Sequence, residues 1–320
     1  MGNIKLYKDF LKEVFSEGGS HGELPVQSSN GCKIGQARGP ARTVRKVALN
    51  AGFSCPNLDG TVGKGGCAYC DNKSFSAVAT SEFSVMEQLE EGIKKNKKCG
   101  ILAYFQSYTN THAPVQKLRE VFTPVIEHSN VVGISIGTRP DCLSEAVVSL
   151  LADLNKIKPV IVEIGVQSAN DKTLKNINRN HTAAQVREAA ARCKNAGLLI
   201  TSHIIIGLPN EDMNDFVNTA ELIAECGFSA VKIHPLHIVK GTKFAEEYAR
   251  GKIGLLSFED YCKAAADVIR IVQPDVAIER VSAEVQGGLT PPLLAPDWCG
   301  EREKIWKCIN ASLEVELEAR

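Results

Sequence analysis

Three cysteines stand close together on a stretch with the composition of a loop. Cys55, Cys67 and Cys70 lie in the run CPNLDGTVGKGGCAYC, directly after a strand-like stretch at Val44–Asn50. Three thiolates with no fourth nearby do not complete a tetrahedral zinc site. Thiolates are the usual ligands of iron–sulfur clusters, and three of them on a four-iron cluster leave one iron open to a small molecule. The spacing therefore predicts a 4Fe-4S site at these three residues.

The insert between the first two cysteines is rich in glycine. Gly60, Gly63, Gly65 and Gly66 let the backbone fold closely around a bulky inorganic core. The alternative is a pair of incidental cysteines plus a buried one, but a CxxC beside a glycine-rich loop is typical of a functional site.

This loop resembles the cluster loop of the radical S-adenosylmethionine (radical SAM) superfamily. There, the last two of three cysteines are separated by two residues and an aromatic residue precedes the final one, a position filled here by Tyr69. The longer spacing is similar to that of the YhcC/YtqA-type family, relatives of the radical SAM part of the Elongator catalytic subunit. The resemblance runs from Val44 to Lys240, and more loosely to Trp298.

A second motif resembles the Gly-Val-Gln-Ser…Arg-x-His pattern of oxygen-independent coproporphyrinogen oxidase and Elongator-like enzymes. It comprises the run from Glu163 to Ser168 and then Asn178-Arg-Asn-His181. The resemblance implies that Gln167 hydrogen-bonds the ribose of S-adenosylmethionine and that Arg179 binds its carboxylate. A guanidinium grips a carboxylate in a fork; a surface ion pair is the alternative for a lone arginine.

The fifth and sixth strands match further parts of that family. In Ile204–Pro209 the resemblance implies that Gly207 lets the backbone approach the adenine and ribose, with a simple strand end as the alternative. In the sixth-strand region, Leu236 would contact the adenine. His234 and His237 are interpreted either as proton-transfer groups or as satisfied core histidines.

Two motifs depart from the family pattern. Where the oxidase has Gly-Gly-Gly-Thr-Pro-Thr, this chain has the run from Gln106 to Thr111. Thr109 is retained, and Gln106 and Ser107 are predicted to supply oxygens to the cofactor's amino group in place of the glycines. The Glu-Thr-Arg-Pro-Asp pattern of Elongator-like relatives appears without its glutamate, although Arg139 and Asp141 remain to line the site.

These motifs follow strand-like runs that alternate with helical patterns, which favours a parallel sheet with right-handed crossovers. The predicted strands are Val44–Asn50, Ile101–Gln106, Val131–Gly137, Val160–Gln167, Leu199–Gly207 and Ala230–Pro235. The predicted helices are Leu6–Phe15, Ser84–Lys97, Pro114–His128, Leu143–Asn155, Ala183–Ala196, Asn214–Cys226, Thr242–Tyr248, Phe258–Val272 and Trp298–Leu317. Six units are too few for a complete eight-stranded barrel.

The fold class is therefore α/β, an open, partial β/α barrel of about six parallel strands with helical extensions at both ends. We expect an N-terminal extension at 1–43, the barrel at 44–240 and a C-terminal extension at 241–320 that closes it. Val276–Val281 is compatible with a further strand, and Gly287–Pro296 with a loop.

Alternation within one strand predicts a partly polar barrel interior. In Val160–Gln167, Glu163, Gly165 and Gln167 share one face, opposite the apolar face of Val162, Ile164 and Val166. A carboxylate turned inward needs a partner. Either a bound ligand or an internal hydrogen bond can supply it, and the ligand is preferred here, which makes Glu163 a cofactor-binding candidate.

Bulk composition limits the function classes. Lys+Arg and Asp+Glu both total 37, so no global charge attracts nucleic acid. A basic group before the first strand predicts either a phosphate contact or a solvated arm: Lys33, Arg38, Arg42, Arg45 and Lys46. Eleven cysteines without a signal peptide indicate the cytoplasm, and no apolar run approaches a membrane span.

The other eight cysteines form no further CxxC, so most are expected to be small buried hydrophobes rather than a second cluster. They are Cys32, Cys99, Cys142, Cys193, Cys226, Cys262, Cys299 and Cys308.

The leading hypothesis is a radical SAM enzyme. It would cleave S-adenosylmethionine reductively at a 4Fe-4S cluster and generate a 5′-deoxyadenosyl radical that abstracts hydrogen from a substrate. A flavodoxin- or ferredoxin-like protein would donate the electron. Elongator kinship suggests tRNA as the substrate, with a peptide or small metabolite also open. The rivals are a non-catalytic zinc or iron–sulfur module that binds nucleic acid or regulates, and a degenerate fold that binds the cofactor without cleaving it.

Overall fold

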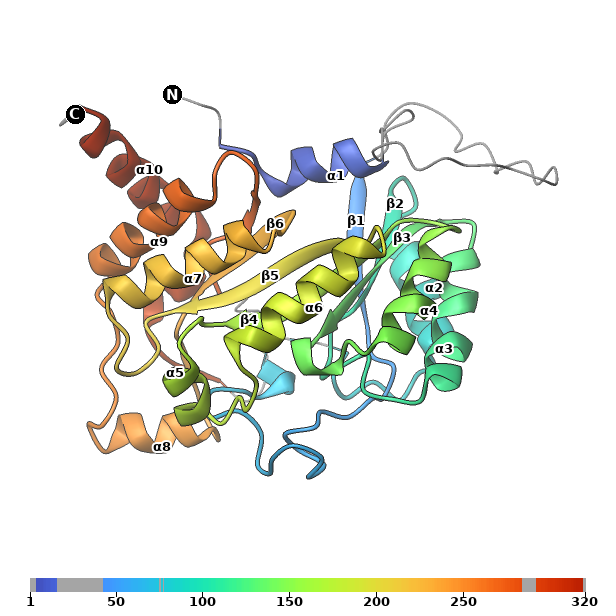
Figure 1. Cartoon of the computed structure of the whole chain (residues 1–320), viewed down its shortest axis with the longest axis horizontal. Helices are drawn as coiled ribbons and strands as arrows, with labels where there is room; N and C mark the ends of the chain where they lie inside the picture. Colours follow the sequence, from blue (N-terminus) through green and yellow to red (C-terminus); the bar gives the residue numbers. More distant parts are fainter. Residues whose placement is uncertain (1–3, 16–42, 75, 77, 284–291, 319–320) are drawn as a thin grey trace.

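A curled, wholly parallel seven-stranded sheet forms the centre of the protein (Figure 1). The computed structural model describes residues 4–15, 43–74, 76, 78–283 and 292–318, with side chains up to residue 314. The strand order is β1-β2-β3-β4-β5-β6-β8. The strands are β1 Val44–Leu49, β2 Gly100–Phe105, β3 Val131–Thr138, β4 Val160–Gln167, β5 Leu199–Ile206, β6 Ala230–Pro235 and β8 Ala277–Arg280. The sheet is an open, partial barrel.

Helices cover the outer face of this sheet, and α9 packs against both α7 and α10. The crossover helices are α2 Val85–Lys95, α3 Val115–Glu127, α4 Glu145–Asn155, α6 Ala183–Asn195 and α7 Met213–Glu225, followed by α9 Phe258–Val272 and α10 Arg302–Glu318. Several begin at side-chain caps. Ser84 and Glu87 form a capping box on α2, and Thr182 and Gln185 form one on α6. These caps satisfy backbone N–H groups that the first turn leaves without partners.

Short elements complete the two ends of the barrel. The helix α1 (Tyr7–Phe15) lies across the N-terminal ends of the strands, whereas α5 (Asp171–Asn176) and α8 (Lys243–Ala249) lie at their C-terminal ends (Figure 1). A two-stranded antiparallel sheet pairs β7 (Ile238–Val239) with β9 (Leu293–Ala295). Three 3-10 turns are η1 Asn72–Ser74, η2 Pro140–Cys142 and η3 Asp297–Gly300.

Strand alternation separates two cores. Val162, Ile164 and Val166 of β4 are fully buried in the core between sheet and helices. Ile161 points the other way and packs inside the barrel with Tyr7 and Phe10 of α1. The first helix therefore closes the N-terminal end of the barrel with apolar side chains, and the predicted alternation is confirmed.

The predicted class is confirmed, and β8 adds a seventh strand at the position compatible with one. Because β8 lies in 241–320, that segment contributes to the sheet as well as covering it; the predicted domain limits stay a prediction. The sequence did not indicate α5, β7 or β9, because six, two and three residues are too few to show a period.

Some expectations fall outside the described residues, namely those on Lys33, Arg38, Arg42, Cys32 and part of the 287–296 loop. Of the basic group, Arg45 is exposed, but Lys46 points into the barrel, so neither a solvated arm nor a phosphate contact describes it. In the part of the chain that is described, no helix has the length and apolarity needed to cross a membrane.

Candidate functional site

The cysteine loop leaves the C-terminal end of β1, on the side of the barrel opposite α1 (Figure 1). Cys67 is buried, Cys55 is half-buried and Cys70 is exposed toward a pocket. Surrounding protein atoms raise the pKa of the Cys70 thiol, and the neighbouring Cys67 and Cys55 sulfurs raise it further. The loop thus gathers the three predicted sulfurs into one place.

Three thiols on one loop suit a cationic group, because thiolates are ligands of metal ions and of iron–sulfur clusters. Within the described ranges, no three His, Cys, Asp or Glu side chains lie close enough to hold a single metal ion. Three thiolates are a donor set that can hold three irons of a four-iron cluster, whereas a structural zinc ion takes four ligands. The donor set therefore fits a four-iron cluster.

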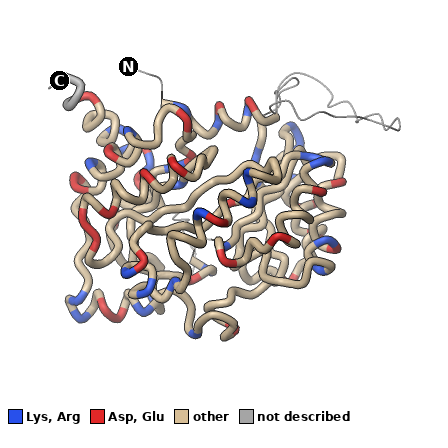
Figure 2. The backbone as a smooth tube through the Cα atoms, in the orientation of Figure 1, with Lys and Arg blue, Asp and Glu red and all other residues tan. Residues whose placement is uncertain are grey.

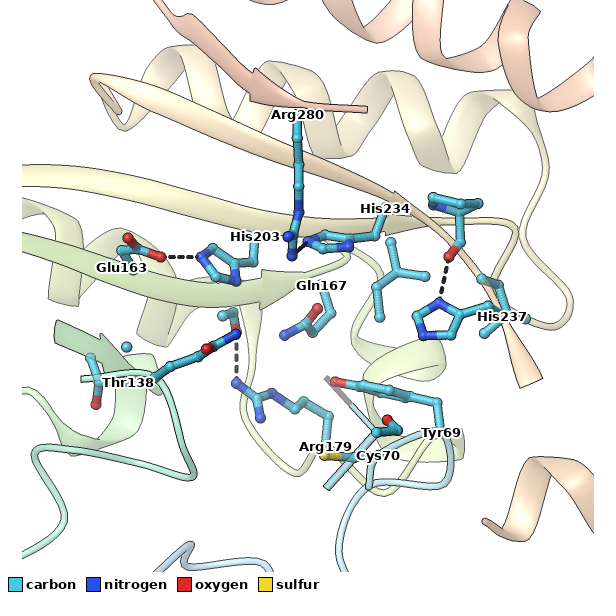
Figure 3. A pocket seen from close by; sticks show the side chains of 17 residues that line it. Tyr69, Cys70, Thr138, Glu163, Gln167, Arg179, His203, His234, His237 and Arg280 are labelled. Atoms are coloured by element: carbon cyan, nitrogen blue, oxygen red, sulfur yellow. Dashed lines mark hydrogen bonds and ion pairs between the residues drawn. The ribbon is translucent and has the colours of Figure 1, made fainter. Parts of the chain in front are cut away.

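A pocket opens beside the loop and extends into the barrel interior (Figure 3). Tyr69, Cys70 and Arg179 line its cluster side, and Gly165 and Gln167 of β4 line its middle. His203, His234, His237, Leu236 and Arg280 line the far side. Tyr69, Gln106, Glu163, Gln167, Arg179 and Leu236 are the predicted cofactor residues that line this pocket.

Gln167 reaches the pocket through an irregular strand end. The β4–β5 register shifts between Gly165 and Gln167, and Gln167 has a φ of 69°, in the left-handed region that non-glycine residues rarely adopt. A Cβ at Gly165 would lie 2.6 Å from Arg179 Nη2 and 2.8 Å from Gln167 Nε2. Glycine is therefore required for these two polar side chains to meet over the strand.

Arg179 lies against the cluster loop. Its Nη2 donates to the carbonyl of Gly165 at 2.9 Å, and its Nη1 approaches Cys67 Sγ at 3.8 Å. Burial works against the charge, but Tyr69 and Cys67 raise the pKa of the guanidinium, so it stays protonated. Its Nε is buried without a partner among the described residues. The predicted contact with the cofactor carboxylate stays a prediction.

Three other predicted residues lie behind the pocket wall. Ser107 is fully buried, with its Oγ 3.1 Å from Ser76 Oγ, and the backbone N–H of Thr109 donates to the carbonyl of Ser54. Gly207 has a φ of 92°, and a Cβ there would meet Leu256 at 3.2 Å and Leu236 at 3.8 Å. A side chain at Gly207 would therefore press on residues around the pocket.

Glu163 finds its partners inside the protein. It accepts hydrogen bonds from Ser135 Oγ at 2.5 Å, Lys46 Nζ at 2.7 Å and Lys232 Nζ. Burial would raise the pKa of this carboxyl, but Lys232 and Lys46 bring it well below its usual range. The structure thus shows the internal partners that were the alternative to a ligand, and the side chain is completely buried among them. Because Glu163 also lines the pocket, its predicted contact with a cofactor stays a prediction.

This network continues as an ionic layer across the barrel. Lys46 Nζ lies 2.6 Å from Glu279 Oε1, and Lys232 Nζ lies 3.3 Å from the same oxygen. The Lys232 ammonium also lies 4.6 Å from the centre of the Tyr104 ring. Two lysines and two glutamates thus neutralise one another beneath the pocket. We define Lys46, Tyr104, Glu163, Lys232 and Glu279 as the ionic layer.

Three neutral histidines face the pocket above this layer (Figure 3). Burial lowers the pKa of His203 to about 4, although its Nε2 lies 2.8 Å from Glu163 Oε2. Burial and then Arg280 lower the pKa of His234, whose Nε2 accepts from Arg280 Nη2 at 3.1 Å. Burial also lowers the pKa of His237, whose Nδ1 lies 3.2 Å from the carbonyl of Pro235.

Each partner selects one tautomer, because a carbonyl or carboxylate accepts and a guanidinium donates. His203 and Arg280 were missed from the sequence. The alternation of β5 and β6, which places His203 beside Lys232 in the register, was the available signal for His203.

Arg139 and Asp141 were expected to line the site, but they support it from behind. The Arg139 guanidinium binds the Asp141 carboxylate through two hydrogen bonds of 2.9 and 2.7 Å. Its Nη2 also donates to the carbonyl of Arg179 at 2.8 Å. Arg139 is 1% exposed and therefore positions the Arg179 turn rather than a ligand.

The remaining described cysteines include Cys193, Cys226, Cys262 and Cys299, all of them buried. Burial, and then a hydrogen bond with Cys308, raise the pKa of the Cys262 thiol. Cys299 and Cys308 are not part of any single-ion ligand group within the described residues.

Comparisons with known proteins agree with this geometry. Residues 61–223 match the radical SAM superfamily, and residues 228–314 match the radical SAM C-terminal domain. Protein YhcC of Escherichia coli (strain K12) is 41% identical over 261 residues, which cover 81% of this chain and 84% of that protein. The uncharacterized protein YtqA of Bacillus subtilis (strain 168) is 38% identical over 279 residues, covering 85% of each chain.

Among solved structures, Elp3 from the archaeon Methanocaldococcus infernus has a TM-score of 0.59 at 19% identity. The match covers 84% of this chain and 63% of that one. At this identity the likeness concerns the fold alone.

Proposed function

The chain belongs to the radical SAM superfamily, in its YhcC/YtqA-type branch, and on that premise we propose that it is an enzyme that cleaves S-adenosylmethionine at a 4Fe-4S cluster. Membership implies both groups as cofactors. The observation that supports the proposal most is the convergence of Cys55, Cys67 and Cys70 beside a pocket that contains Arg179 and Gln167. When bound, the reduced cluster would supply the one electron that breaks the bond between the sulfonium sulfur and the 5′ carbon of S-adenosylmethionine, which gives methionine and a 5′-deoxyadenosyl radical able to take a hydrogen atom from a substrate.

The residues of the chain would bind and orient the cofactor. Cys55, Cys67 and Cys70 would hold the irons, and the Arg179 guanidinium would grip the carboxylate of the methionine part. Gln167 would hydrogen-bond the ribose, and Leu236 would pack against the adenine, with Gly207 behind it. Gln106, whose side chain lines the pocket, would contact the amino group, whereas Ser107 and Thr109 would act from behind through the shape of their loop.

The far wall of the pocket would receive the substrate. His203, His234 and His237 are neutral at physiological pH because burial lowers their pKa values. Neutral imidazoles with assigned tautomers present one donor or acceptor each, so this wall selects a substrate by its hydrogen-bonding pattern. The ionic layer beneath it excludes water from the barrel floor, which protects a reactive radical from side reactions.

We include tRNA in the proposal as the substrate, because the family is related to Elongator. Lys and Arg positions are spread over the end of the barrel that carries α5, α8 and the cysteine loop (Figure 2). Exposed lysines on these elements include Lys64, Lys172 and Lys175. They offer places for phosphates to bind. Charge over the whole chain is balanced, so this attraction would be local. A flavodoxin- or ferredoxin-like protein is the proposed electron donor.

The test is an anaerobic release assay. Protein reconstituted with iron and sulfide, then given dithionite and S-adenosylmethionine, should release 5′-deoxyadenosine. Cys67→Ala should abolish the release, because one corner of the cluster loses its ligand. Cys99→Ala is the matched control, since Cys99 lies beside the start of β2 at the other end of the barrel, and it should keep the release.

The rivals give different results. A zinc-loaded binding module would contain no iron or sulfide under anaerobic conditions. A degenerate fold would contain the cluster and bind S-adenosylmethionine but release no 5′-deoxyadenosine. Either result from protein with intact thiols would overturn the proposal.

A further inference from the structure

The cysteine loop is fastened by a turn that lies far from it in the sequence. The backbone N–H of Ala68 donates to the carbonyl of Ile177 at 2.9 Å. Asn178 Nδ2 donates to the carbonyls of Lys64 at 3.0 Å and Gly66 at 2.7 Å. The turn at 177–181 therefore holds the second half of the loop, just before Cys67.

Asn57, which lies in the cysteine loop, donates hydrogen bonds to the 177–181 turn. Its side chain is completely buried, and its Nδ2 donates to the carbonyls of Asn178 at 2.5 Å and Arg179 at 3.2 Å. The same Nδ2 lies 3.4 Å from Cys67 Sγ. Because backbone carbonyls only accept, they determine which end of the amide is the N–H end. The Asn57 N–H group therefore also faces the sulfur.

In this orientation the oxygen end of the Asn57 amide, Oδ1, is buried and has no hydrogen-bond donor among the described residues. A buried carbonyl oxygen without a donor is unfavourable, so the contacts of Nδ2 must outweigh it. We call Asn57 together with the 177–181 turn the clasp.

The turn has the backbone that the clasp requires. Asn178 and Asn180 have φ angles of 56° and 59°, in the left-handed region where asparagine is the most tolerated residue after glycine. This conformation directs two consecutive carbonyls, those of Asn178 and Arg179, at a single amide. Arg139 Nη2 holds the second carbonyl from the other side.

The clasp and Arg179 converge on one sulfur. Arg179 Nη1 lies 3.8 Å from Cys67 Sγ, so Cys67 receives an amide N–H and a guanidinium N–H. Cys70 has only a longer and exposed contact in the same network, from Asn72 Nδ2 at 3.8 Å. The donors are thus concentrated on the buried cysteine.

We propose that Asn57 is a positioning residue, which fastens the cysteine loop to the 177–181 turn and directs its N–H at Cys67 so that a cluster bound there has a raised reduction potential. The inference rests on the proposed function. Hydrogen bonds to ligand sulfurs and nearby positive charge stabilise the reduced, more negative state of an iron–sulfur cluster. Asn57 acts through Cys67 and does not touch substrate.

Two variants test the amide. Asn57→Leu has a similar volume and no donor, and Asn57→Asp has the same shape with a negative charge. The midpoint potential of the reconstituted protein is measured by anaerobic redox titration with EPR detection, and iron and sulfide are counted in each sample. The expected order of potentials is wild type, then Asn57→Leu, then Asn57→Asp as the lowest.

Asn176→Leu is the matched control. It is the same substitution at an exposed asparagine, the last residue of α5, outside the 177–181 turn. We expect its potential to equal that of the wild type. A smaller iron content in Asn57→Leu than in Asn176→Leu would support the fastening role.

The outcomes separate this inference from the proposed function. Wild-type protein that never acquires a 4Fe-4S cluster would overturn the proposed function. A wild type with a cluster, whose potential and iron content are shared by the Asn57 variants, would overturn only the role of Asn57. If one variant does not retain iron, the other still gives the sign of the shift against the wild type.

Discussion

The two ends of the barrel interior satisfy their polar groups in different ways. Toward α1, the floor consists of an apolar plug, with Tyr7 and Phe10, beneath an ionic layer in which Glu163 accepts from Lys46, Lys232 and Ser135. At the opposite end, the mouth contains a left-handed Gln167 and buried polar atoms without partners, such as Arg179 Nε.

The difference between floor and mouth indicates which groups serve mainly stability and which serve function. The charged side chains of the floor are ion-paired with one another, so their removal should mainly destabilise the fold. Groups in the mouth hold strained or incomplete arrangements, which persist only when the surrounding structure imposes them and which are common at active sites. Glu163 lies between the two regions, because it lines the pocket and is also ion-paired with the lysines of the floor.

The largest effect is expected from Glu163→Ala, which tests whether the ionic layer stabilises the fold. Removing the carboxylate leaves Lys46 and Lys232 buried with one acid fewer, and breaking a buried pair in this way costs about 3–5 kcal/mol. We expect the free energy of unfolding in urea to fall by that amount. Glu188→Ala, at a side chain 65% exposed, is the control and should change little. Equal unfolding midpoints for Glu163→Ala and the wild type would show that the floor is not structural.

Phe10→Ala tests the plug. Phe10 is 4% exposed, and truncating a buried phenylalanine removes apolar contacts and leaves a cavity, at a cost of about 3 kcal/mol. Thermal or urea unfolding should show the loss. Phe83→Ala is the matched control because Phe83 is 65% exposed. If both substitutions had the same small effect, α1 would not seal the barrel.

Glu211 brings a pH dependence to the mouth. It accepts a hydrogen bond from Ser168 Oγ, and burial raises the pKa of its carboxyl from 4.5 to about 7. A pKa raised in the folded state means that the contribution to stability is complete below pH 4.5 and is lost as the pH rises through 7. We expect Glu211→Gln, which stays neutral, to lose less stability than the wild type between pH 4.5 and pH 8.

At pH 8 the wild type should have lost roughly 2 kcal/mol more unfolding free energy than Glu211→Gln. Each pKa unit corresponds to about 1.4 kcal/mol, and the partial exposure of the side chain reduces the effect. Urea titrations at several pH values would measure it. Parallel stability–pH curves for Glu211→Gln and the wild type would contradict the assignment.

The smallest expected effect is a gain in stability, whereas the substitutions in the floor should lower stability. Gln167→Gly relieves a left-handed backbone and should stabilise the ligand-free protein by about 1 kcal/mol. In the proposed function it should also weaken S-adenosylmethionine binding, as measured by equilibrium dialysis. Gln185→Gly, in the first turn of α6, is the control and should lose stability, because glycine disfavours a helix and the capping box with Thr182 loses its second side chain. If Gln167→Gly lost stability, Gln167 would be a stabilising residue like those of the floor rather than a strained one.

Much of the architecture could be predicted, because strands and helices have local periods. The alternation of Val160–Gln167 correctly separated the face that packs on helices from the face that lines the barrel. Short elements such as α5 were missed, since six residues give no period. The candidate site was predicted in part: Arg179 and Gln167 line the pocket, whereas His203 and Arg280 entered it only through the structure.

The sequence by itself determined the three-cysteine loop, the β-α alternation and the inward face of each strand, because all of these are written in neighbouring residues. Only the tertiary structure decided the partners. Lys46 meets Glu163 across 117 residues, and Arg179 meets Cys67 across 112. Such pairs depend on the register of distant strands and on how loops pack over them, which no local pattern encodes. For that reason the cysteine loop could be recognised from the sequence, whereas the ion-paired floor and the left-handed Gln167 at the mouth became visible only in the folded barrel.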